Sequence, residues 1–162
     1  MIGNGEIEIF FLCLLHYNDT CKVNQQFTGG ERKVVKLNIQ TAELALREAS
    51  ESNPGAWADH SRFVAEACKN IASHCKDLSS EQAYIFGLLH DIGRYAGVSS
   101  ERHLIDGYRY CMERGWEKAA QICISHAFMI QDIATSIGEF DVSDQDYLFM
   151  KEFVANAVYD DY

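Results

Sequence analysis

The chain has 162 residues, of which 48% are hydrophobic and one is proline, so it can form a single folded domain with a sizeable core and is not a disordered protein. Its formal net charge is −10. That charge repels nucleic-acid backbones and anionic membranes, which argues against both as partners. It would also repel a phosphate ester, so phosphate chemistry in this protein would need a local positive centre.

Residues 1–37 differ from the rest of the chain because they lack a helical pattern. The apolar run at residues 7–15 is too short to span a membrane, and no Lys or Arg precedes it as in a signal peptide. Residues 29–33 (GGERK) can be encoded by purines alone and resemble a translated ribosome-binding site, which would place a natural start at Val34, Val35 or Leu37. We expect an atypical N-terminal extension that is either not native or a strand or loop packed on the domain of residues 38–162.

From residue 38 onward, apolar residues recur at helical spacing and predict about six helices with short connections. The expected helices run from Ile39 to the stop at Asn53-Pro54-Gly55; along His60, Val64, Ala67 and Ile71; from the Ser79 cap to Gly93; from near His103 to Gly115; from about Trp116 to Ile130; and from the Ser143 capping box through Met150, Val154 and Val158. Gly87 lies inside the third helix, which suggests that another element approaches closely there. The predicted fold class is all-α, an irregular helical bundle.

The six cysteines contain no CxxC pair, so their spacing does not provide a zinc-binding frame. Scattered cysteines of this kind are typical of buried thiols in a reducing compartment. Together with the absence of a recognisable signal peptide, this pattern predicts a cytoplasmic protein.

Three histidines lie on or beside the predicted apolar faces. His60 falls on the stripe of the second helix, His90 continues the stripe of the third, and His126 lies near the buried face of the fifth. Asp91 follows His90 directly. Imidazole and carboxylate groups together suit Zn, Fe, Mn or Ni. A hydrogen-bonded core histidine is the alternative for any one of these residues, but the set with its neighbouring aspartate favours a metal site.

Residues 87–94 (GLLHDIGR) resemble the signature of the HD superfamily of metal-dependent phosphohydrolases, in its HDIG variant. Residues 57–65 (WADHSRFVA) resemble the helix that carries the first histidine of that family. His103, followed by Asp106-Gly107-Tyr108, resembles the additional histidine of members with two metals, and Ser125-His126 resembles the next one. The resemblance covers roughly residues 38–162.

The resemblance implies one or two divalent ions, of Mn, Fe, Mg, Ni or Zn. His60, His90 and Asp91 would hold the first ion together with a late aspartate, and Asp91 would bridge to a second ion on His103 and His126. Such ions supply a hydroxide near neutral pH, because a metal lowers the pKa of its water toward ~7. The implied substrate is a phosphomonoester or phosphodiester, such as a nucleotide or a related small molecule.

Arg94 stands where the family often has Lys or Arg. It could contact a phosphate oxygen of the substrate, and a solvated cation at a helix end is the alternative.

The late aspartate is where the sequence departs from the family pattern. Asp160 and Asp161 are the only late candidates, and residues so close to a terminus make poor scaffolds for a ligand. We therefore expect that the chain stops before the segment with the last ligand. Two other functions stay open: a non-catalytic HD module that senses or binds a partner, and an HD-type di-iron oxygenase.

Overall fold

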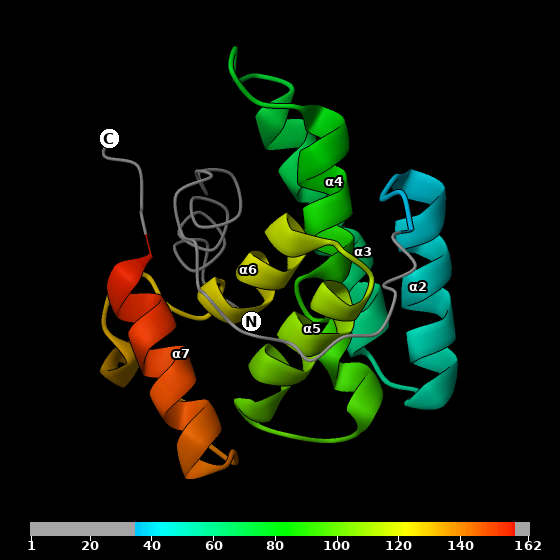
Figure 1. Cartoon of the computed structure of the whole chain (residues 1–162). Coiled ribbons are helices and arrows are strands. Elements are labelled where there is room, and N and C mark those ends of the chain that lie inside the picture. Colours follow the sequence, from blue (N-terminus) through cyan, green and yellow to red (C-terminus); the bar gives the residue numbers. More distant parts are fainter. Residues whose placement is uncertain (1–34, 158–162) are drawn as a thin grey trace.

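The computed structural model describes residues 35–157, and within them it contains six α-helices and no strand, so the all-α prediction is confirmed (Figure 1). The elements are α2 (Ile39–Ser52), α3 (Trp57–Ala72), α4 (Ser80–Leu89), η1 (Ile92–Ala96), α5 (Arg102–Glu113), α6 (Glu117–Ser125), η2 (Ile133–Thr135) and α7 (Asp144–Asn156), where η denotes a 3₁₀ helix. Asp160 and Asp161, most of the predicted N-terminal extension and the inward position of Val158 lie outside the described residues.

Local capping explains where most of the helices begin and end. The side chains of Ser79 and Ser143 accept hydrogen bonds from the backbone amides three residues later, which is the N-cap half of the predicted capping boxes. Helix α5 ends at Glu113, and Gly115 follows two residues later with a φ of 74°, which is readily adopted only by glycine; the Trp116 amide then donates to the Cys111 carbonyl at 2.9 Å. The predicted stop at Gly115 is therefore confirmed.

Two predicted helix ends are wrong. The third predicted helix ends at Leu89 and continues as the 3₁₀ helix η1, whereas Gly93 was the expected end. The fifth ends at Ser125, so Ile130 lies beyond it and is 57% exposed. In both cases the α-helix stops immediately before a histidine, at His90 and at His126.

Close backbone contacts between elements bring these helix ends together. A Cβ atom on Gly87 would lie 2.5 Å from the Ala65 Cα of α3, which confirms the close approach predicted at this glycine. A Cβ on Gly93 would lie 1.9 Å from the His103 carbonyl oxygen of α5. Only glycine fits at either position, so α4 packs on α3 and η1 packs on α5 at backbone distance.

The core lies between α3, α4, α5 and α6, with α2 and α7 on opposite sides of the bundle (Figure 1). Its largest fully buried side chains come from most of the helices: Leu46, Leu88, Leu89, Ile92, Leu104, Ile105, Ile122, Ile124, Phe128 and Met150. Among residues 35–157, none of the helices combines the length and the apolar character needed to cross a membrane.

Candidate metal centre

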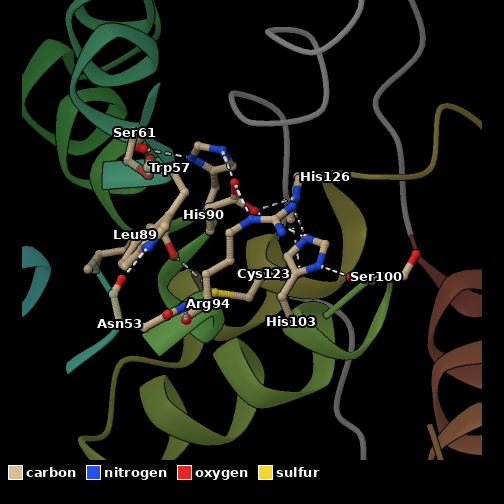
Figure 2. A network of polar contacts seen from close by, with 12 residues as sticks. Asn53, Trp57, Ser61, Leu89, His90, Arg94, Ser100, His103, Cys123 and His126 are labelled. Atoms are coloured by element: carbon tan, nitrogen blue, oxygen red, sulfur yellow. Dashed lines mark hydrogen bonds and ion pairs between the residues drawn. The ribbon is translucent and has the colours of Figure 1, made fainter. Parts of the chain in front are cut away.

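The five predicted metal ligands come together at one point of the bundle. Figure 2 shows three of them, His90, His103 and His126, side by side. They form two donor groups that share Asp91. We call His60, His90 and Asp91 the first donor group, and Asp91, His103 and His126 the second. Within each group, the candidate ligand atoms all lie within 4.8 Å of one another.

Helix ends supply most of these side chains. His90 and His126 stand directly after the last residues of α4 and α6, and Asp91 follows in the turn before η1. His103 lies in the first turn of α5, and His60 lies in the first turn of α3. Because the glycine contacts fix these helices against one another, the rings are held by the packing of the bundle rather than by a loop.

Three of the four rings are tethered to the backbone through Nδ1. The Nδ1 atom of His90 donates to the Gly87 carbonyl at 2.7 Å, and that of His103 donates to the Ser100 carbonyl. The Nδ1 of His126 lies 3.1 Å from the carbonyl oxygens of both Ile122 and Cys123. A carbonyl oxygen can only accept, so each Nδ1 carries a proton, and Nε2 is the ring nitrogen that is left to bind a metal.

These Nε2 atoms face the carboxylate of Asp91. The Oδ1 atom lies 3.1 Å from His103 Nε2 and 3.6 Å from His126 Nε2, and Oδ2 lies 3.7 Å from His90 Nε2. All four residues are buried. Imidazole nitrogens and a carboxylate that converge at these distances can hold a cation between them.

Burial and neighbouring charges set the protonation of His90 and Asp91. Burial lowers the pKa of His90 to about 3, and the nearby Asp91 carboxylate offsets this only in part. Burial would raise the pKa of Asp91, but the histidines around it hold that pKa well below its usual range. At neutral pH the group is therefore a carboxylate beside a neutral His90. Imidazole nitrogens and a carboxylate fixed by backbone hydrogen bonds fit a divalent transition metal.

His60 differs from the other three histidines because its side chain is exposed, so the predicted inward orientation is wrong. Helix α3 instead buries Ala58, Ser61, Ala65 and Cys68, and His60 lies at the margin of that face. Its ring still meets the ring of His90 edge-on, with centroids 5.3 Å apart, and partial desolvation lowers its pKa. His60 therefore marks the side of the centre that is open to solvent.

Arg94 is part of the centre rather than a solvated cation at a helix end. Its Nε donates to Asp91 Oδ2 at 2.9 Å, and its Nη2 lies 3.4 Å from His103 Nε2. The Asn53 side chain donates to the Arg94 carbonyl at 2.7 Å (Figure 2). Sequence reasoning gave Asn53 only the role of a helix stop, and the spacing of 41 residues between the two gives no local signal.

The late aspartate is not found in the part of the chain that the structure describes. Among residues 35–157, Asp91 is the only carboxylate in either donor group. Asp160 and Asp161 lie outside that range, so their role as ligands stays a prediction.

Comparison with known proteins gives one match. The family model described as HDOD domain matches residues 32–121, which is more than half of the chain and includes His60, His90, Asp91, Arg94 and His103. The match ends before His126. No curated protein and no solved structure matches the chain.

Proposed function

The chain belongs to the HDOD-domain family, which is related to HD domains, and on that premise we propose that it is a metal-dependent phosphohydrolase. The observation that carries the proposal is the convergence of three buried imidazole Nε2 atoms on the carboxylate of Asp91. The substrate we propose is a phosphomonoester or phosphodiester of a nucleotide or related small molecule. A reducing, cytoplasmic setting suits Cys68, Cys75, Cys111 and Cys123, which are free thiols.

Each residue of the centre has a role that follows from its position. His60, His90 and Asp91 would hold one divalent ion, and Asp91, His103 and His126 would hold another. The backbone tethers of His90, His103 and His126 keep their Nε2 atoms directed inward, so the ligands need little reorganisation on binding. An ion bound there would lower the pKa of a bound water toward ~7 and stabilise charge that develops on phosphorus-bound oxygens.

The electrostatics of the chain also suit this function. A net charge of −10 repels an anionic substrate, and the divalent ions would offset that repulsion at the one place where it matters. The exposed His60 leaves one side of the centre accessible to a substrate, while the burial of the other ligands limits the access of bulk water. The side chain of Arg94 is 31% exposed, and it is the cation best placed to contact a phosphate oxygen.

The test combines metal content with activity. We expect the purified protein to retain Mn, Fe, Ni or Zn in elemental analysis and to hydrolyse an aryl phosphate or a bis-aryl phosphodiester with added Mn²⁺. The His90→Ala and Asp91→Ala variants should lose the metal while circular dichroism shows that their helical content is kept. Metal occupancy equal to that of the wild type in both variants would refute the site.

A non-catalytic module is the second candidate, and one observation favours it. Among the described residues, Asp91 is the only carboxylate of the centre, and Arg94 already forms an ion pair with it. A protein that binds metal stoichiometrically but hydrolyses neither class of phosphate ester would support this second candidate over the first.

A further inference from the structure

Arg94 connects the two donor groups, and it does so by contacting one atom of each. Its Nε donates to Asp91 Oδ2, the oxygen that faces His90 in the first donor group. Its Nη2 approaches His103 Nε2, a ligand atom of the second donor group, at 3.4 Å. The guanidinium is therefore a positive charge that lies inside the proposed centre and belongs to the chain itself.

The contact with His103 is made at the atom that a metal would need. His103 Nδ1 already donates to the Ser100 carbonyl, so Nε2 is the ring nitrogen left for a metal. This Nε2 lies 3.1 Å from Asp91 Oδ1 and 3.4 Å from Arg94 Nη2. A metal ion in the second donor group must bind His103 Nε2, beside which the guanidinium already places a positive charge. Arg94 and the second ion therefore compete for one position.

The first donor group does not pose the same conflict. A carboxylate oxygen has two lone pairs, so Asp91 Oδ2 can accept from Arg94 Nε and still serve as a ligand. An ion in the first donor group can therefore bind while Arg94 keeps its contact with Asp91. An ion in the second donor group can bind only after Arg94 has moved away from His103.

Only the side chain of Arg94 has to move. Its backbone is fixed at both polar groups, because its amide donates to the Asp91 carbonyl at 3.0 Å and its carbonyl accepts from Asn53 at 2.7 Å. The side chain is 31% exposed, so it has a path toward solvent and toward the open side of the centre.

We propose that Arg94 is a positioning residue that occupies the second metal position, so that two ions bind in sequence and the second displaces the guanidinium from His103. This inference rests on the proposed metal binding, and it adds the order in which the two ions bind. The displaced guanidinium becomes available to a substrate phosphate only when the second ion is present, which couples substrate contact to full metal loading.

Calorimetric titration of the metal-free protein with Mn²⁺ tests the proposal. Wild type should show a tighter and a weaker site. Arg94→Gln should tighten the weaker site by at least about tenfold, the scale on which groups around a metal act, and should change the tighter site much less. Arg94→Lys keeps the charge and should stay closer to wild type. Arg62→Gln is the matched control, because Arg62 is a cation on α3 that pairs with Asp59 outside both donor groups.

A second measurement uses only the wild-type protein, so it does not require that a variant fold correctly. The Nε–H resonance of Arg94, observed by NMR in the wild-type protein, should change little with the first equivalent of Mg²⁺ or Zn²⁺ and should shift with the second. A shift that is complete at the first equivalent would overturn the proposed order.

The outcomes separate this inference from the proposed function. If wild type binds two ions and Arg94→Gln leaves the weaker site unchanged or weakens it, the role of Arg94 is refuted and metal binding stands. If only Arg94→Gln binds a second ion, the competition is demonstrated directly. If neither protein binds metal, both proposals fail.

Discussion

Acid should destabilise the metal-free protein through His90. The imidazole is 1% exposed, and burial lowers its pKa to about 3 from 6.5 in the unfolded chain. Between these two values the unfolded state binds a proton that the folded state does not. The free energy of unfolding is therefore at its full value above pH 6.5 and falls as the pH decreases toward 3.

The magnitude follows from the same two values. Between pH 7 and pH 5, protonation of His90 in the unfolded state alone should lower the free energy of unfolding by about 2 kcal/mol. The pKa of Asp91 is lowered below the ordinary value of 3.8, so Asp91 titrates outside this window. The lowered pKa of His60 adds a contribution of the same sign.

Urea denaturation at pH 7 and pH 5, after treatment with a chelator, measures this decrease. His90→Asn removes the titrating ring and places an amide donor near the position of Nδ1, so its decrease should be smaller than that of wild type by about 2 kcal/mol. His74→Asn controls for the loss of one histidine, because His74 is exposed and lies outside the centre. An equal decrease in wild type and His90→Asn would refute the argument that His90 is held neutral by burial.

Three further predictions address the packing, the two donor groups and the start of α5. Gly87→Ala and Gly93→Ala should each destabilise the fold by about 2–3 kcal/mol through overpacking, but the first should weaken the Mn²⁺ site on His60 of α3 and the second the site on His103 of α5. Urea denaturation and Mn²⁺ titration would measure both effects, and equal weakening of both sites by both variants would contradict this division. His60→Ala should abolish binding of the first ion. His103→Ala and His126→Ala should each lower the calorimetric stoichiometry from two ions toward one. If the wild type binds one ion and these two variants bind the same number, His103 and His126 are core residues and not ligands. Asp141→Ala should lower the free energy of unfolding by about 1 kcal/mol, because the Asp141 carboxylate accepts from the amides of Ser100 and Arg102 at 3.0 and 2.8 Å at the start of α5. Thermal denaturation would measure this loss, with Asp77→Ala at an exposed position as the control. Equal stability of the two variants would show that the cap is unimportant.

Hydrophobic periodicity and local capping signals were sufficient to predict the helices. Ser79, Ser143 and Gly115 act within a few residues of themselves, so their roles are visible in the sequence. The ends expected at Gly93 and Ile130 were wrong because apolar residues continue beyond the actual helix ends. At those ends, the ring of His90 or His126 donates a hydrogen bond to a carbonyl of the last turn. Periodicity records burial, and it contains no information on such side-chain hydrogen bonds.

At the metal centre, the sequence likewise identified the candidate residues but not the contacts that depend on tertiary packing. The adjacent pair His90-Asp91 and the other histidines could be proposed from the sequence, and the fold brings them together. The contact of Arg94 with His103 and the cap that Asp141 provides for α5 depend on tertiary packing, so no spacing predicts them. The exposure of His60 was missed because a residue at the margin of a helical stripe shares its periodicity with the buried residues.

The histidines that end α4 and α6 also determine which ends of those helices meet at the centre. A helix carries roughly half a negative charge at its carboxyl end, and His90 and His126 place two such ends beside Asp91. The backbone therefore contributes a field that attracts cations even before the ligand atoms are considered. Substitution of one ligand leaves this field in place, so a single variant that has lost tight, specific binding should still attract divalent ions weakly and without selectivity among metals.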